Sequence, residues 1–127
     1  MNAIDCTLVP VNNNDASILT KMRVFGLFTP DEDTVIYGRG DSARRHYCIS
    51  HVKSRFDENS LAALDSEEIS DATKKAIKTQ YMKICSLAFL FGIGKDCVRD
   101  QYNRLIPINL SPQNERNILE NNNGPLS

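Results

Sequence analysis

The longest helical pattern of the chain lies between Ser66 and Gly92. Apolar residues recur at three- and four-residue spacing from Ile69 to Ile84, which places them on one side of a helix. Lysines occupy the opposite side, and a serine followed by acidic residues is typical of a helix N-terminus. The pattern therefore predicts one long helix over about 67–91, closed by the glycines that follow it.

The second half of this helix differs from the first, because from Ile84 to Phe91 no residue is charged and every side is apolar or small. A helix of this kind is surrounded by protein or lipid, and the run is about half of the ~20 residues needed to cross a membrane. We therefore expect it to form the centre of the core. Truncation of Leu87 or Phe91 to Ala would then cost about 2–5 kcal/mol.

Shorter patterns precede the long helix. Residues 4–11 alternate like a strand, although Pro10 weakens the pattern. Asp15 is placed to cap a helix with apolar positions up to Phe25. A capping box with proline at the first helical position begins at Thr29, and we favour a short helix there, although residues 35–37 fit a short strand equally well.

The remaining patterns are also mostly helical. Ser42 is placed to cap a helix reaching Phe56, followed by a helical turn over 61–64. After the long helix, residues 96–105 carry apolar positions that suit a shorter amphipathic helix, and a last helix is expected to start at Ser111.

These elements predict a mainly α fold, an irregular helical bundle around the central helix over about 67–91, with a short N-terminal strand or extended segment. At 127 residues the chain is long enough to bury one core. We expect a single helical domain over 1–120 and a polar, flexible tail over 121–127.

The first residues and the cysteines indicate the cellular location to expect. The first residues do not resemble a secretory signal, so we expect a cytoplasmic, intracellular protein with no membrane segment. The four cysteines are far apart without a Cys-x-x-Cys pair, and we interpret them as reduced structural thiols. No cofactor or metal is expected. No segment matches the motif set of a known family.

The net charge of −1 conceals three consecutive blocks whose net charges alternate in sign. Residues 39–55 sum to about +4, residues 57–71 to about −6, and residues 74–83 to about +4. Such blocks either neutralise one another within the fold or pair between copies of the chain.

A candidate binding surface follows from the two basic blocks. On a helix over 42–56, Arg44, Tyr47, His51 and Arg55 would form one exposed stripe, which suits phosphates and stacked bases. The full candidate surface consists of Arg44, Arg45, Tyr47, His51, Lys53, Arg55, Lys74, Lys75 and Lys78.

Catalytic signatures are weak. His46 and His51 are five residues apart, so on a helix they would face different sides and would not chelate one metal. Cys48 and His51 have the spacing of a thiolate and imidazolium pair, but we expect Cys48 on the apolar side, with a raised pKa and little reactivity. The glycines before Lys95 lack the spacing of a phosphate loop. We therefore expect no enzyme.

The sequence favours a non-enzymatic binding or assembly module, which contacts a partner protein or associates with itself. The alternative is a nucleic-acid-binding protein that uses the basic helix over 42–56. A protein partner or self-association is the expected interaction.

Overall fold

The computed structural model describes residues 3–108, so the helix expected from Ser111 and the expected tail lie outside the described residues. The strands are β1 (Ile4–Pro10), β2 (Thr34–Tyr37), β3 (Arg44–Cys48), β4 (Ile93–Arg99) and β5 (Leu105–Pro107). The α-helices are α1 (Ala16–Val24), α2 (Pro30–Asp33), α3 (Ile49–Leu64) and α4 (Asp71–Phe91). Two short 3-10 turns, η1 (Asn13–Asp15) and η2 (Gly40–Ser42), complete the described chain.

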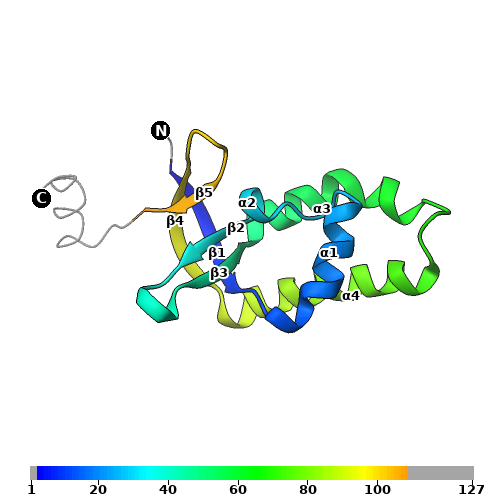
Figure 1. Cartoon of the computed structure of the whole chain (residues 1–127), viewed down its shortest axis with the longest axis horizontal. Coiled ribbons are helices and arrows are strands. Elements are labelled where there is room, and N and C mark those ends of the chain that lie inside the picture. The colour runs from blue at the N-terminus through cyan, green and yellow to red at the C-terminus, as the bar shows by residue number, and fades with distance from the viewer. Residues whose placement is uncertain (1–2, 109–127) are drawn as a thin grey trace, which may run out of the picture.

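The strands form one antiparallel sheet in the order β2-β3-β1-β4-β5, which curls into a nearly closed barrel. β1 is the middle strand, with Leu8 opposite Cys48 of β3 and Ile4 opposite Cys97 of β4. The long helices α3 and α4 extend away from the barrel as an antiparallel hairpin, and α1 lies across it (Figure 1). The molecule is thus a small barrel with a helical arm.

The predicted helical bundle is wrong, because three segments that were expected to be helical contain strands. In the segment over 42–56, the helix begins only at Ile49, and residues 44–48 form β3 between β1 and β2. Residues 96–105 lie in β4, a turn and the start of β5. After Thr29 the helix lasts a single turn and the strand alternative over 35–37 is confirmed. Backbone pairing between distant strands overrides local helical spacing at these places.

Three predicted elements are confirmed. The N-terminal strand is β1, the helix after Asp15 is α1, and the long helix is α4. α4 begins at Asp71 rather than near residue 67. Its N-cap is Ser70, whose side chain accepts a hydrogen bond from the amide of Thr73 at 3.1 Å. The side chain of Ser66 instead accepts from the amide of Glu68, which stabilises the preceding turn.

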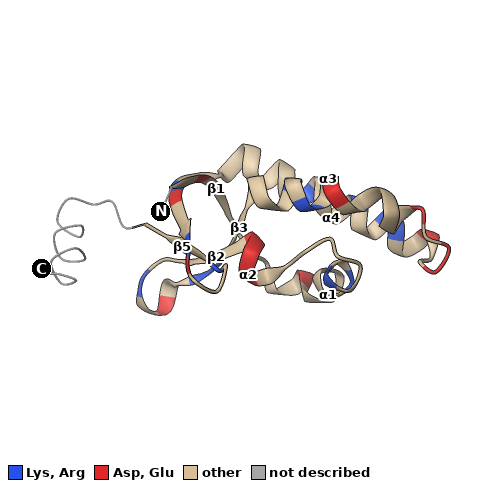
Figure 2. Cartoon of the chain, turned by 90° about the horizontal axis from the view of Figure 1, so that it is seen from above, with Lys and Arg blue, Asp and Glu red and all other residues tan. Residues whose placement is uncertain are grey.

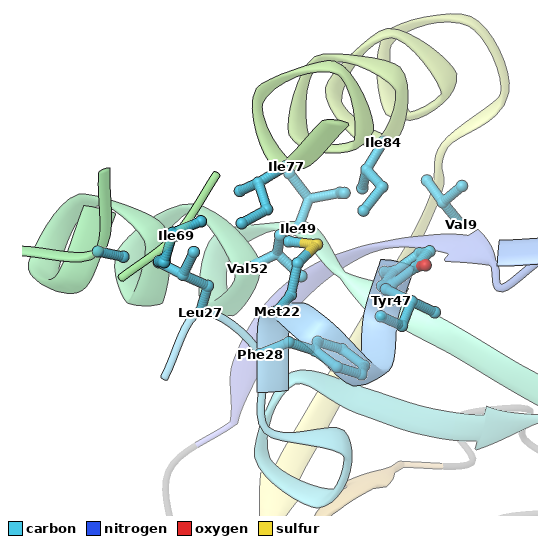
Figure 3. Packing of buried hydrophobic residues seen from close by; sticks show 12 residues of the cluster. Val9, Met22, Leu27, Phe28, Tyr47, Ile49, Val52, Ile69, Ile77 and Ile84 are labelled. Carbon is cyan, nitrogen blue, oxygen red and sulfur yellow. The ribbon is translucent and has the colours of Figure 1, made fainter. Parts of the chain in front are cut away.

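One core lies where the helices meet the outer face of the barrel (Figure 3). Ile77 and Ile84 of α4 pack against Met22 of α1 and Val52 of α3. From the sheet, Val9 and Tyr47 contribute to the same cluster. The single buried stripe on each helix explains why the helical spacing was readable from the sequence.

The end of α4 is not the buried centre that the sequence suggested. Phe89, Leu90 and Phe91 are 89%, 64% and 67% exposed, and Leu87 is only half-buried. Only one side of α4 contacts α1, α3 and β1, so the remaining sides of its last turns face solvent. Within residues 3–108, no helix is both long enough and apolar enough to span a membrane.

Candidate functional site

The predicted basic stripe does not form. Tyr47 belongs to β3 and is buried in the core, with its ring 6.0 Å from that of Phe28 in an edge-to-face contact. Arg45 is half-buried and donates a hydrogen bond to the hydroxyl of Thr34 at 2.6 Å. The stripe assumed one helix over 42–56, but Arg44 and Tyr47 lie on β3, whereas His51 and Arg55 lie on α3. On a strand, neighbouring side chains point to opposite faces, so the four side chains do not share one surface.

Arg55 of that stripe is engaged inside the protein. Its guanidinium donates to Asp33 Oδ2 at 2.7 Å and to Glu32 Oε1 at 2.6 Å, both on α2. Burial raises the pKa of Asp33, opposed by the amide of Thr29 and by Arg55. The hydrogen bond from Arg55 lowers the pKa of the more exposed Glu32. This cation is therefore paired with two of the three acidic residues of α2 and is not available to a polyanion.

The other predicted cations are scattered. Arg44 and Lys53 are exposed near the barrel, whereas Lys74, Lys75 and Lys78 lie on the first turns of α4. These turns are beside the acidic connection between α3 and α4, at the far end of the helical arm (Figure 2). Nucleic-acid binding stays a prediction that rests on these separated residues.

A different surface is unusual in composition. The last turn of α4 and the start of β4 expose Phe89, Leu90, Phe91 and Ile93, and we call these four residues the α4 apolar end. From residue 84 to residue 94 the sequence contains no charged side chain. Clustered exposed apolar residues usually mark an interaction surface, whereas single ones are ordinary.

A groove adjoins the α4 apolar end. It has a volume of about 490 Å³ and lies between α4 and the segment from the end of β1 to η1. Leu87 and Phe91 line one side, and Val9, Pro10 and Val11 line another. Its remaining lining residues are Asn12, Asn13 and Arg44. An apolar protrusion and an apolar groove therefore occur side by side.

The barrel interior contains a second candidate site, made of three cysteines and a histidine. Cys6, Cys48 and Cys97 come from the adjacent strands β1, β3 and β4 and are fully buried. The strand register directs all three side chains to the interior face. His51 follows in the first turn of α3, and the ligand atoms of Cys6, Cys48 and His51 all lie within 4.8 Å of one another. Among residues 3–108, the cysteines form no disulfide.

The thiols influence one another strongly. Cys6 donates to Cys48, and this bond, together with the hydroxyl of Ser50 at 3.4 Å and the amides of Ser50 and His51, lowers the pKa of Cys48 to about 7. Hydrogen bonds with Cys48 and Cys97 raise the pKa of Cys6. The expected raised pKa of Cys48 is thus wrong, because its sulfur lies at the start of a helix and accepts from several donors.

The imidazole of His51 is oriented by Arg99 of β4. The guanidinium Nη2 of Arg99 lies 2.8 Å from His51 Nδ1 and also donates to the carbonyl oxygen of Glu32 at 2.7 Å. Burial, and then the positive charge of Arg99, lower the pKa of His51. The ring is therefore neutral at neutral pH, and its single lone pair accepts the hydrogen bond from Arg99.

The Cys48 and His51 pair can be recognised from its spacing in the sequence, but the cluster around it cannot. The alternation over residues 4–11 placed Cys6 on the inward face of a strand, which was the only available indication. Cys48 and Cys97 were assigned to helices, where no common face joins them. Comparison of the chain with protein-family models, with curated proteins and with solved structures gave no match.

Proposed function

We propose that this protein is a non-enzymatic assembly module that associates with a second copy of itself through the α4 apolar end. The observation that carries the proposal is the exposure of Phe89, Leu90 and Phe91 on one uncharged segment. Each aromatic side chain offers about 150–250 Å² of area. At about 25 cal/mol per Å², burying them in a partner supplies several kcal/mol.

The shape and charge of the α4 apolar end favour association with a second copy of the chain over binding of a different protein. A two-fold interface brings the same surface of both copies together, so it needs a protrusion and a groove on one surface. Leu90 and Phe91 border the groove, which provides the complement, and Phe89 extends the exposed apolar area around the end of α4. The absence of charge from 84 to 94 means that these segments of two copies meet without like-charge repulsion, and Arg44 lies in the lining of the adjoining groove.

The size of the surface is adequate for the centre of a dimer interface. Stable interfaces bury about 800 Å² per partner, and their apolar centre is surrounded by a polar rim. Arg44, Asn12 and Asn13 lie at the rim of the groove and suit hydrogen bonds across the interface. We also propose a cytoplasmic location, which the free cysteines support.

The test is the mass of the particle as a function of concentration, by light scattering and analytical ultracentrifugation of the full chain. The wild-type protein is expected to dimerise, and Phe89→Ser combined with Leu90→Ser to weaken dimerisation at least about tenfold, the effect of 1.4 kcal/mol. Matched controls are Val24→Ser and Leu61→Ser, which remove similarly exposed apolar side chains outside the α4 apolar end.

Salt separates this proposal from pairing of the charged blocks. An apolar interface keeps its strength when sodium chloride is raised, whereas contacts between acidic and basic blocks weaken. A wild-type protein that stays monomeric at the highest attainable concentration would refute self-association. Equal weakening by the control variants would refute the assigned surface.

A further inference from the structure

Two of the three buried thiols, those of Cys6 and Cys48, and the imidazole of His51 meet the main geometric requirement of a metal site. Around a tetrahedral zinc ion, with Zn–S near 2.3 Å and Zn–N near 2.0 Å, ligand atoms are separated by about 3.3–3.8 Å. The sulfurs of Cys6 and Cys48 and a ring nitrogen of His51 already lie within 4.8 Å of one another. Side-chain rotations that shorten the largest of these separations by about 1.0–1.5 Å would close the remaining difference.

The ligand types suit the same class of ion. Thiolate and imidazole together select zinc over calcium or magnesium, which prefer oxygen. Cys48 is the N-cap of α3 and His51 lies three residues later, so the two project from the same end of the helix. The amides of Ser50 and His51 donate to the Cys48 sulfur, and such donors stabilise a thiolate before and after a metal binds.

A fourth ligand is available on the neighbouring strand. Cys97 is fully buried on the same interior face of β4, which pairs with β1, and its sulfur lies outside the group of three ligand atoms that are within 4.8 Å of one another. Three protein strands and one helix terminus therefore converge on one point inside the barrel. The interior around these thiols is otherwise apolar, with Leu8, Val35 and Leu105 as neighbours, so water does not compete for the site.

We propose that Cys6, Cys48, Cys97 and His51 bind one zinc ion, which fastens β1, β3 and β4 to the start of α3. Such a closed four-ligand set is typical of a structural site, since it leaves no open position for a substrate. The role is thus separate from the proposed association through the α4 apolar end.

Binding has a local consequence at Arg99. A ring nitrogen that coordinates zinc no longer accepts a hydrogen bond, so the contact of Arg99 with the coordinating nitrogen is lost. Arg99 keeps its hydrogen bonds to the carbonyl oxygens of Glu32 at 2.7 Å and Asn103 at 3.1 Å. These two bonds hold the guanidinium at the edge of the barrel while the imidazole turns toward the sulfurs.

The experiment uses the full chain, prepared with a chelator and a reductant and then titrated with Co²⁺ and with Zn²⁺. One Co²⁺ per chain is expected, with thiolate-to-cobalt charge-transfer bands and the intense visible bands of tetrahedral coordination, which Zn²⁺ then removes. Cys48→Ser should lower Zn²⁺ affinity at least about 100-fold, and His51→Gln about 10- to 100-fold. Cys85→Ser is the matched control, because that cysteine lies on α4 outside the barrel, and it should bind as the wild type does.

A second measurement on the wild-type chain does not depend on folding of the variants. The rate at which a thiol reagent modifies each cysteine is followed by mass spectrometry with and without Zn²⁺. Zinc should slow modification of Cys6, Cys48 and Cys97 and leave Cys85 unchanged. Absence of thiolate-to-cobalt bands in the reduced protein overturns the proposal, and so does equal protection of all four cysteines.

Discussion

The buried positions of α4 and its exposed end should differ strongly in their sensitivity to truncation. Ile77→Ala removes a side chain that is fully buried between α1 and α3, whereas Phe89→Ala removes a larger one that is 89% exposed. Truncating a buried isoleucine costs about 2–5 kcal/mol, because transfer energy is lost and a cavity remains. For Phe89, about a tenth of roughly 200 Å² is buried, and at about 25 cal/mol per Å² this amounts to ~0.5 kcal/mol.

The assay is urea unfolding followed by far-UV circular dichroism, at a protein concentration low enough for the monomer to dominate. The expected result is a clear fall in the free energy of unfolding for Ile77→Ala and a change below about 1 kcal/mol for Phe89→Ala. Ile84→Ala provides a second buried position on the same helix and should resemble Ile77→Ala. If Phe89→Ala costs the dilute monomer as much as Ile77→Ala, the end of α4 is a core segment and our account of the exposed surface is wrong.

Two other predictions concern stability and use the same unfolding assay. Arg55→Met should cost about 3–5 kcal/mol at neutral pH by leaving the buried carboxylate of Asp33 unpaired. Burial raises the pKa of Asp33, so this loss grows as the pH rises through the folded pKa and shrinks toward pH 3.8; a loss independent of pH would contradict the assignment. Gly92→Ala should cost about 1–3 kcal/mol, because a Cβ there overlaps the carbonyl of Ala88 and the methyl of Thr7. Gly94→Ala, with open space around its Cβ position, is the control and should change stability by less than about 1 kcal/mol; equal losses would exclude the steric explanation.

The helices that were correctly predicted have one property in common. In α1 and α4 a single stripe of side chains, such as Met22 and Ile77, is buried against other elements, so the local period carries the information. The strand β3 carries no such information, because Arg44 to Cys48 are mixed in character. Its strand conformation depends on β1 and β2, which lie elsewhere in the sequence.

The candidate sites were obscured for related reasons. The apolar run up to Phe91 was predicted to be a buried core segment, but its last turn is exposed. Hydrophobicity alone does not distinguish a protein's own core from an exposed interaction surface. The cysteine cluster depends on strand order, since Cys6 and Cys97 are neighbours only because β1 and β4 pair. Sequence spacing alone therefore could not bring them together.

The middle position of β1 has a consequence for how the chain folds. Its partner β3 begins about forty residues later and β4 about ninety residues later, so most of its backbone pairing is long-range in sequence. Proteins dominated by such contacts fold slowly, because the chain loses conformational entropy in bringing distant segments together before their contacts stabilise it. During synthesis, β1 emerges first and must wait for β4 to leave the ribosome. We expect the α3 and α4 hairpin to form early and the barrel to close last.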